Sequence, residues 1–319
     1  MRVIPYHSAI PPDLRGASAA LGNFDGLHAG HREVIAQARK TAAFLNAPLI
    51  VATFEPSPRL HFQPNAVPFR LMTARRRAIE LAGLGVDACC LLRFDAEMAS
   101  MTDREFAQHV LRDQLALRAV AVGFDFRFGK GRTGAAETLR RLGEELGFET
   151  SIVEEVAEDG RKVSSTGIRQ MIQNGDMRGA GAALGGYWIV DAVVEHGEKR
   201  GRSLGFPTAN LSLGDIVSPA HGVYAVWARL DEESAWRPGV ASFGRTPTTG
   251  LRDPLLEVVI FDFAGDLYGR RLHVAFAAHL RPEIKFEGIE ALVEQMRDDA
   301  AEARAALGVL SPPLSDHPE

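Results

Sequence analysis

The first half of the chain alternates short apolar runs with longer segments of helical periodicity, and this alternation constrains the fold more than any other feature. Apolar runs typical of strands lie at residues 19–24, 48–54, 88–94, 119–123 and 150–154. Segments typical of helices lie between them, at residues 32–45, 74–82, 103–114 and 136–146. Strands that alternate with helices predict an α/β domain with a doubly wound parallel sheet. Such sheets bind ligands at the carboxyl ends of their strands, so residues directly after each strand are the candidates for function.

The pattern changes near Leu184-Gly-Gly-Tyr187. Beyond this point, strand-like runs with no long helix between them lie at residues 188–194, 222–230, 256–263 and 272–278. They predict a small antiparallel sheet or barrel, closed by a helix over residues 288–307. A length of 319 residues exceeds the ~250 residues of most single domains, which also favours two domains. We therefore expect one domain over residues 1–184, a second over 185–310 and a flexible tail over 311–319.

Composition narrows the class of protein. The 36 Lys and Arg residues and 41 Asp and Glu residues give a formal net charge of −5, which disfavours non-specific nucleic-acid binding. Cys89 and Cys90 are adjacent and would point to opposite faces of a strand, which argues against a disulfide framework or a thiolate metal site. The first residues lack the apolar core of a signal peptide, and no apolar run approaches the ~18 residues of a membrane span. We expect a cytoplasmic protein without a nucleic-acid or membrane partner.

The first candidate site is Gly22-Asn-Phe-Asp-Gly-Leu-His-Ala-Gly-His31, which ends the first strand and opens the first helix. His28 and His31 are three residues apart, so on a helical turn they share a face. At a helix N-terminus their imidazoles could hydrogen-bond phosphate oxygens and stabilise charge developing on phosphorus. Two alternatives are surface histidines on a tight turn and a zinc site that includes Asp25. The other phosphate-binding candidates of this segment are Gly22, Asn23, Phe24, Asp25 and Gly30.

Two further segments follow later strands of the same predicted sheet. Ser164-Ser-Thr-Gly-Ile-Arg169 begins a predicted helix over residues 166–173, where hydroxyl groups and Arg169 could form a second phosphate cradle. Simple helix capping with a solvated arginine is the alternative there. Residues 124–134 combine glycines with three aromatic and three basic residues, so an aromatic face could stack on a planar ring. A surface loop with buried phenylalanine anchors is the alternative.

The second half contains one glycine-rich segment, residues 197–210, with three glycines. Gly201 and Gly205, with the basic residues around them, could form a flap over phosphates. Thr208 and Asn210 point the same way on an extended segment, and their neutral oxygens suit Mg²⁺ held with a nucleotide phosphate. A hairpin loop that enters a strand is the alternative.

In this order, the motifs resemble those of the prokaryotic bifunctional riboflavin kinase/FMN adenylyltransferases, also called FAD synthetases. The adenylyltransferase motifs are residues 22–31, Thr53-Phe-Glu-Pro56, residues 123–129 and residues 164–169. The kinase motifs are Gly201-Arg-Ser-Leu-Gly-Phe-Pro-Thr-Ala-Asn210, Leu256-Glu-Val258 and Tyr268-Gly269. The resemblance implies a Rossmann-like nucleotidyltransferase domain followed by a riboflavin kinase β-barrel with a C-terminal helix. It also implies two reactions: riboflavin and ATP give FMN and ADP, and FMN and ATP give FAD and pyrophosphate.

The resemblance implies a role for each candidate residue. The residues at the ATP phosphates of the adenylyltransferase would be His28, His31, Ser164, Ser165, Thr166 and Arg169, and those at the flavin would be Asp125, Phe126 and Phe128. In the kinase, Thr208 and Asn210 would hold Mg²⁺ and ATP, and Glu257 would be the general base. Without the family, Glu257 is interpreted as an exposed strand residue.

The chain departs from the family pattern at a few positions: Ser57 replaces a frequent histidine, Ser242 replaces an asparagine, and Arg245 lies one place early. The rival functions are a bifunctional enzyme with a weak kinase, a nucleotide-binding regulatory module, and a transferase for a non-flavin phosphate. The expected partners are small-molecule substrates, and the expected state is a monomer or a weak homo-oligomer.

Overall fold

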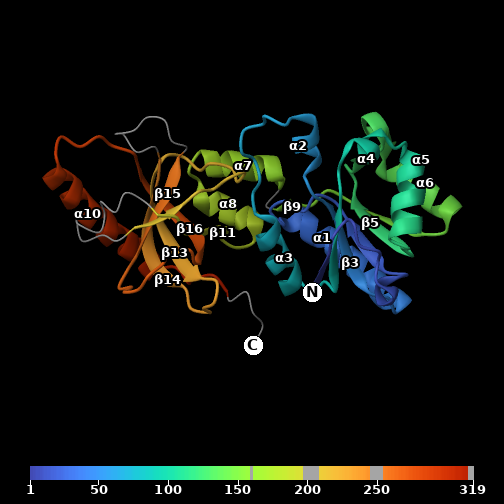
Figure 1. The fold of residues 1–319 in the computed structure, drawn as a ribbon, viewed down its shortest axis with the longest axis horizontal. Helices are drawn as coiled ribbons and strands as arrows, with labels where there is room; N and C mark the ends of the chain where they lie inside the picture. The colour runs from blue at the N-terminus through green and yellow to red at the C-terminus, as the bar shows by residue number, and fades with distance from the viewer. Residues whose placement is uncertain (159–160, 197–207, 245–253, 315–319) are drawn as a thin grey trace. The chain divides into compact units, whose positions relative to one another are not determined.

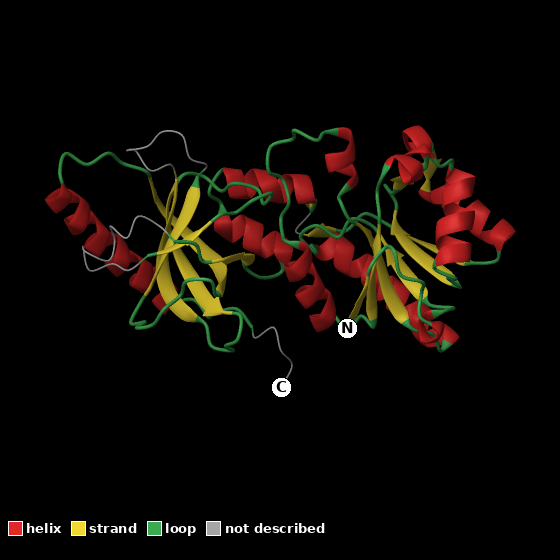
Figure 2. Cartoon of the chain, viewed as in Figure 1, coloured by secondary structure: helices red, strands yellow, loops and turns green. Residues whose placement is uncertain are grey.

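The computed structural model describes residues 1–158, 161–196, 208–244 and 254–314. Contacts divide the chain into two compact units, Met1–Ala66 with Arg77–Ser164 and Val67–Arg76 with Ser165–Glu319. Each unit has its own sheet and its own helices, and each is described by itself (Figures 1 and 2). The change of sequence pattern near Leu184 lies inside the second unit.

The first unit is built on a six-stranded parallel sheet with the order β1-β4-β3-β2-β5-β8. Its strands are β1 (Arg2–Ile4), β2 (Ser18–Leu21), β3 (Leu49–Phe54), β4 (Ala88–Leu92), β5 (Ala119–Gly123) and β8 (Glu149–Val153). The five predicted strands are confirmed, and β1 is added at the edge of the sheet. β1 escapes prediction because it has only three residues and two of them are exposed.

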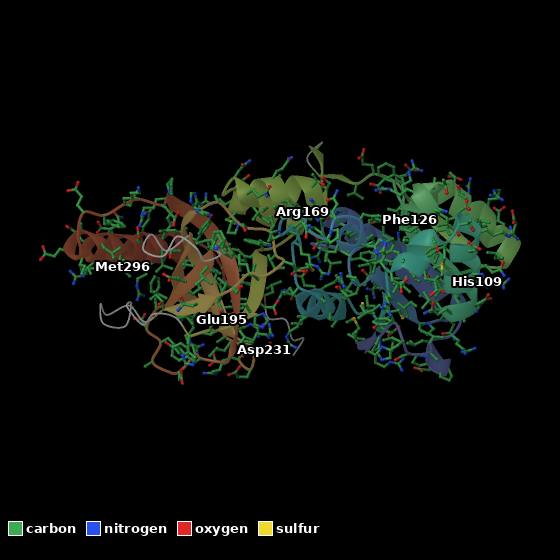
Figure 3. The ribbon with its side chains drawn as sticks, turned by 45° about the horizontal axis from the view of Figure 1, so that its top comes forward. His109, Phe126, Arg169, Glu195, Asp231 and Met296 are labelled. Atoms are coloured by element: carbon green, nitrogen blue, oxygen red, sulfur yellow. The ribbon has the colours of Figure 1, made fainter. Side chains whose placement is uncertain are left out.

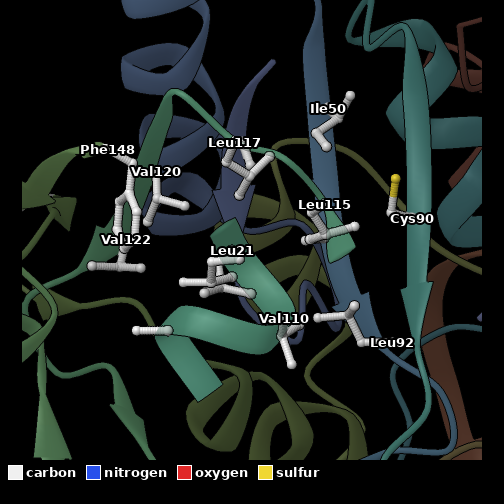
Figure 4. Close-up of a cluster of buried hydrophobic side chains, with 14 of the residues drawn as sticks. Leu21, Ile50, Cys90, Leu92, Val110, Leu115, Leu117, Val120, Val122 and Phe148 are labelled. Carbon is white, nitrogen blue, oxygen red and sulfur yellow. The ribbon is translucent and has the colours of Figure 1, made fainter. Parts of the chain in front are cut away.

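Helices cover both faces of this sheet. The longer helical elements are α1 (Ala29–Leu45), α3 (Ala74–Gly83), the π-helix η2 (Phe106–Gln114) and α6 (Ala136–Leu146); the first three residues of α3 belong to the second unit. A hydrophobic cluster joins one face of the sheet to η2 and α6 and includes Leu21, Ile50, Leu92 and Val110 (Figure 4). No residue of α1 belongs to that cluster; α1 packs against β2, where the Ser18 hydroxyl donates to the Ala38 carbonyl at 2.8 Å.

A capping box stands at the start of the helix expected over residues 103–114. The backbone N–H of Thr102 donates to the Glu105 carboxylate at 2.9 Å, and the backbone N–H of Glu105 donates to the Thr102 hydroxyl at 3.2 Å. The expected single helix is instead one α-turn, α5 (Asp103–Glu105), followed by η2. The remaining short elements are η1 (Pro12–Leu14), α2 (Pro58–Phe62), α4 (Ala96–Ser100), β6 (Arg127–Phe128), η3 (Lys130–Arg132), β7 (Gly134–Ala135), β9 (Ala157–Glu158) and β10 (Arg161–Lys162).

Cys89 and Cys90 are free thiols buried in β4. Only Cys90 belongs to the cluster with η2 and α6, which agrees with the prediction that the two side chains point to opposite faces. Burial raises the pKa of Cys89 to about 11 and that of Cys90 to about 12. Both thiols are therefore protonated at neutral pH and poorly nucleophilic.

The second unit is built on a six-stranded antiparallel sheet with the order β11-β16-β13-β14-β15-β12. Its elements are α7 (Ser165–Gln173), α8 (Met177–Leu184), β11 (Trp188–Val193), β12 (Ala209–Leu211), β13 (Gly222–Leu230), β14 (Arg237–Gly244), β15 (Leu255–Ile260), β16 (Arg271–Pro282) and α10 (Ile289–Gly308). An isolated antiparallel bridge between Glu195 and Asn210 joins the two edges of the sheet. The sheet therefore curls into the predicted barrel.

Helix α10 packs on one face of this sheet, where Ala303 and Leu307 meet apolar residues of β13 and β16. Arg281 of β16 makes two hydrogen bonds of 2.7 Å to the buried carboxylate of Asp299, which fixes the helix on the sheet. Past the helix, the Tyr187 hydroxyl donates to the Ser311 carbonyl at 2.6 Å, at the start of the predicted tail. Residues 315–319 of that tail lie outside the described residues.

A segment from the N-terminal half of the sequence, residues 67–76, is part of the second unit. We call it the 67–76 segment. The Trp188 indole donates to its Leu71 carbonyl at 2.8 Å, and the Val217 N–H donates to its Arg70 carbonyl at 2.8 Å. Three side-chain contacts also join it to the barrel: Thr73 to Asp191 at 2.6 Å, Arg70 to Asp215 at 2.8 Å, and Arg75 to Asp231 at 2.6 Å.

Candidate active sites

The loop between β2 and α1 has a backbone fixed by buried side chains. Phe24 and Leu27 have the positive φ angles 48° and 42°, and their side chains are 1% and 0% exposed. A left-handed backbone at such residues costs about 1–3 kcal/mol each, and burial of the two side chains offsets that cost. The loop is therefore a rigid turn that delivers His28 to the N-cap of α1.

His28 and His31 lie together at the start of α1, as their spacing predicts. Their rings stack with centroids 3.8 Å apart and an angle of 18° between the planes, and His28 is only 8% exposed. A Cβ at Gly30 would lie 3.3 Å from Cε1 of His28, so this glycine leaves room for the ring. Free N–H groups at the start of a 17-residue helix favour an anion, and the two imidazoles lie at that end.

The motif Thr53-Phe-Glu-Pro56 supports this loop from the neighbouring strand. The Thr53 hydroxyl donates to the backbone carbonyl of Asn23 at 3.1 Å, and Arg77 donates to the same carbonyl at 3.4 Å. Arg77 is 7% exposed and pairs with Glu55 at 3.0 Å. Sequence reasoning missed Arg77 because nothing in a helical arginine shows which distant loop it holds.

The predicted flavin-binding residues follow β5. Phe126 is half-buried and stacks on Phe128, with ring centroids 5.6 Å apart, and Asp125 is exposed (Figure 3 labels Phe126). Phe128 is 6% exposed and packs against Phe106, with ring centroids 5.5 Å apart. Phe128 is thus one of the buried anchors that the alternative interpretation expected, while Phe126 lies nearer the surface.

A second aromatic group was missed by the sequence reasoning. Phe94, two residues after the end of β4, contacts Phe54 at 5.8 Å, His61 at 5.6 Å and Phe62 at 5.7 Å between ring centroids. Phe62, on α2, is 65% exposed, which is unusual for a ring of that size. The position of Phe94 at the carboxyl end of a parallel strand was the available signal.

The segment with Ser164, Ser165, Thr166 and Arg169 is divided between the units, with Ser164 in the first and the other three in the second. Ser165 begins α7, and Thr166 and Arg169 lie on it. Arg169, labelled in Figure 3, donates to the Phe69 carbonyl at 2.6 Å. Its guanidinium lies over the Phe69 ring, 5.7 Å from the centroid. The 67–76 segment therefore holds the Arg169 side chain in place.

The kinase candidates meet across three strands of the second unit. Asn210 of β12 lies directly opposite Glu257 of β15, which lies directly opposite Ser242 of β14. Residues directly opposite each other in antiparallel strands share a face of the sheet, so Asn210 and Glu257 are neighbours. Thr208 is two residues before Asn210, on the same side of the extended chain. Gly201, Gly205 and Arg245 lie outside the described residues.

Within the described ranges, no group of three or more His, Cys, Asp or Glu side chains is placed to hold a metal ion, so the zinc interpretation finds no such group around His28, His31 and Asp25. Among the helices of the same ranges, none combines the length and the apolar character that crossing a bilayer requires.

Comparisons with known proteins agree for both units. A family model described as FAD synthetase matches residues 10–167, and one described as riboflavin kinase matches residues 184–307. A bifunctional riboflavin kinase/FMN adenylyltransferase from Pseudomonas fluorescens is 41% identical over 92% of this chain and 94% of its own length. The protein of that name from Escherichia coli K12 is 37% identical over 96% of this chain and 97% of its own. A crystal structure named as the macrolide-efflux protein from Streptococcus pneumoniae matches with a TM-score of 0.82 and 32% identity, over 95% of this chain and 99% of that one.

Proposed function

The chain belongs to the family of bifunctional riboflavin kinase/FMN adenylyltransferases, and from that premise we propose how its residues divide the two reactions. The protein phosphorylates riboflavin with ATP to give FMN, and it adenylylates FMN with ATP to give FAD and pyrophosphate. The observation that carries the division of residues is that each unit has its own cluster of phosphate-directed groups. These clusters are the histidine pair on α1 and the Asn210–Glu257 pair on the barrel.

For the adenylyl transfer, we assign His28 and His31 to the ATP phosphates. The FMN phosphate is already an anion at neutral pH, so it attacks the α-phosphorus of ATP without a general base, and pyrophosphate leaves. The two imidazoles and the N–H groups of α1 donate hydrogen bonds to the phosphate oxygens as negative charge moves onto them. The backbone of Gly22, Asn23, Phe24, Asp25 and Gly30 lines the same phosphates.

The leaving pyrophosphate needs donors of its own. We assign this role to the hydroxyls of Ser164, Ser165 and Thr166 and to the guanidinium of Arg169. The bond from Arg169 Nε to the Phe69 carbonyl orients this guanidinium, and a guanidinium is the side-chain group best suited to forked recognition of phosphate oxygens.

For the flavin ring of FMN, we assign the aromatic residues at the carboxyl ends of the strands. Phe126 and the exposed Phe62 offer faces for stacking, and Asp125 offers a carboxylate to the polar edge of the ring system. Phe128 supports Phe126 from the core. The surface position of Phe62 supports this assignment, because ligand binding would bury an aromatic ring that otherwise faces water.

For the kinase, we assign Glu257 as the general base. The ribityl hydroxyl of riboflavin is a weak nucleophile at neutral pH, so its attack on the γ-phosphorus of ATP needs a carboxylate that accepts the proton. Glu257 is half-buried and lies directly opposite Asn210, so a base and a phosphate-site residue are neighbours on one face. Gly201 and Gly205 are assigned to a flap over the phosphates.

The residues present fit a Mg²⁺ ion at this site. Asn210 is 7% exposed, and Thr208 precedes it on the same side, so an amide and a hydroxyl oxygen are available beside one carboxylate. Neutral oxygens of this kind, completed by substrate phosphates and water, are the ligands that Mg²⁺ uses in phosphoryl transfer. When bound, the ion supplies positive charge to the transferred phosphoryl group.

We also propose the cellular setting and the domain boundary. Small-molecule substrates are the partners of the reactions. We place the protein in the cytoplasm, as a monomer or weak homo-oligomer without nucleic-acid or membrane partners. Its net charge of −5 supports the absence of a nucleic-acid partner. Residues 1–184 would carry the adenylyltransferase, 185–310 the kinase and 311–319 a flexible tail. Gel filtration and cell fractionation test the setting.

One assay tests the assignment of the two sites. The protein is incubated with riboflavin, ATP and Mg²⁺, and FMN and FAD are separated by chromatography. The parent protein should form both flavins, Asn210→Ala should form neither from riboflavin, and Asn210→Ala supplied with FMN should still form FAD. Loss of FAD formation from supplied FMN in a folded Asn210→Ala variant would contradict the division between the sites.

A further inference from the structure

Glu195 lies beside the proposed Mg²⁺ site and has no role in the assignments above. Its backbone N–H donates to the carbonyl of Asn210 at 2.9 Å, in the antiparallel bridge that joins the two edges of the sheet. Asn210 lies opposite Glu257 on its other side. Glu195, Asn210 and Glu257 therefore form a row across neighbouring strands, with a carboxylate on each side of the amide.

The burial of the flanking residues shows that the row points away from the barrel core. Val194 is 2% exposed, whereas Glu195 is exposed (Figure 3 labels Glu195). The neighbours of Asn210 and Glu257 along their strands are also buried: Ala209 at 1%, Leu211 at 0%, Leu256 at 0% and Val258 at 0%. Side chains alternate between the faces of a strand, so Glu195, Asn210 and Glu257 share the face opposite that core.

Asn210 has an unusual environment for an amide. It is more than nine-tenths buried, and within the described part of the chain no hydrogen bond to its side chain is found. Its amide is not among the fully buried polar groups that lack a partner, so it stays open to a ligand. An asparagine can coordinate a cation only through Oδ1, whereas its NH₂ group would repel it. A metal-binding asparagine therefore needs an acceptor that holds the NH₂ end away from the ion.

We propose that Glu195 is the positioning residue that supplies this acceptor, an inference that rests on the proposed Mg²⁺ role of Asn210. With the ion bound, the Glu195 carboxylate would accept a hydrogen bond from the Asn210 NH₂ group and so turn Oδ1 toward the ion. Residues opposite each other have Cβ atoms about 4.5–5.5 Å apart, which a glutamate side chain spans. Glu257 is the poorer choice of acceptor for the Asn210 NH₂ group, because its assigned role is to accept the proton of the substrate hydroxyl.

Direct binding and activity test this role together. Glu195→Ala, Glu195→Gln and Asn210→Ala are compared with the parent, and Glu302→Gln, an exposed glutamate on α10, is the charge-matched control. ADP binding is titrated by calorimetry at increasing Mg²⁺ in a His28→Ala, His31→Ala background, so that the first unit contributes little. The Mg²⁺ dependence of riboflavin phosphorylation is measured in the chain with both histidines.

We expect Glu195→Ala to raise the Mg²⁺ concentration for half-maximal ADP binding and phosphorylation by about 10–100-fold, the usual cost of losing a group that orients a metal ligand. Glu195→Gln keeps an acceptor oxygen and should shift the requirement less, and Glu302→Gln should not shift it. If Glu195→Ala needs the same Mg²⁺ concentration as the parent while Asn210→Ala needs much more, the positioning role is wrong and the metal site stands. If Asn210→Ala also needs no more Mg²⁺ than the parent, the proposed metal site itself is wrong. Should Glu195→Ala not fold, Glu195→Lys replaces it, because lysine offers no acceptor; an unshifted Mg²⁺ requirement in that variant overturns the role.

Discussion

The indole of Trp188 donates a 2.8 Å hydrogen bond to the backbone carbonyl of Leu71, which joins the first strand of the barrel to a segment from the N-terminal half of the sequence. Trp188 is 1% exposed, so this bond is part of the core of the second unit. Asp191, on the same strand, is 5% exposed and accepts from Thr73 at 2.6 Å. A cut at the proposed boundary near residue 184 would separate both pairs.

The first prediction concerns that boundary. A fragment of residues 1–184 keeps the six-stranded parallel sheet and both phosphate-binding segments, so it should fold and convert FMN to FAD. A fragment of residues 185–319 should phosphorylate riboflavin but unfold at lower urea than the barrel of the intact chain. In this fragment the Trp188 indole and the Asp191 carboxylate lose their partners from the 67–76 segment. Each loss should lower the free energy of unfolding by about 1–3 kcal/mol. Two insoluble fragments would show that the boundary is misplaced.

The second prediction concerns the stacked histidines. His28→Ala should lower FAD formation from supplied FMN by about 10²-fold or more, because one donor to the developing phosphate charge is lost. FMN formation from riboflavin should continue. His109→Ala, the same change at an exposed histidine of η2, serves as the control and should leave both rates unchanged. Equal FAD formation by His28→Ala and the parent, at equal folded protein, would remove His28 from the site.

The third prediction concerns Glu257. Glu257→Gln is nearly isosteric and removes the base, so riboflavin phosphorylation should fall by about 10²–10⁴-fold. The same preparation, supplied with FMN, should still make FAD at the parent rate, which controls for folding of the chain. Normal kinase turnover in this variant would mean that Glu257 is an ordinary strand residue, as the sequence without the family suggests.

Local signals predicted much of the fold. The observed bounds of β5 (Ala119–Gly123), β13 (Gly222–Leu230) and α6 (Ala136–Leu146) equal those expected from the sequence. β2 ends at Leu21, three residues before its predicted end, because Phe24 has a left-handed backbone that no strand continues. The proximity of His28 and His31 was also predictable from a local signal, because residues three apart meet on one helical turn.

Other features depend on distant contacts and escaped prediction. β14 contains Pro238, Gly239 and Gly244, which weaken a strand pattern, and two paired strands compensate for them. α8 was also missed, and its two interior glycines, Gly179 and Gly181, lower its helix propensity. The opposition of Asn210 and Glu257 is a matter of register between strands far apart in sequence, which no local pattern specifies.

The last prediction concerns stability in acid. The Arg75 guanidinium, 2.6 Å away, and His273 hold the pKa of Asp231 at about 2, below its ordinary value. The carboxylate therefore stabilises the fold above the unfolded pKa of about 3.9, and this contribution is lost as the pH falls from about 4 to about 2. Asp231→Asn should lower the free energy of unfolding at pH 7 by roughly 1–2 kcal/mol, a figure reduced because the side chain is partly exposed. Urea unfolding at a series of pH values should show this difference shrinking toward zero near pH 2. Burial lowers the pKa of His273, so both proteins should also lose stability below about pH 6.5. A difference that stays constant from pH 7 to pH 2 would show that the Asp231 charge contributes nothing.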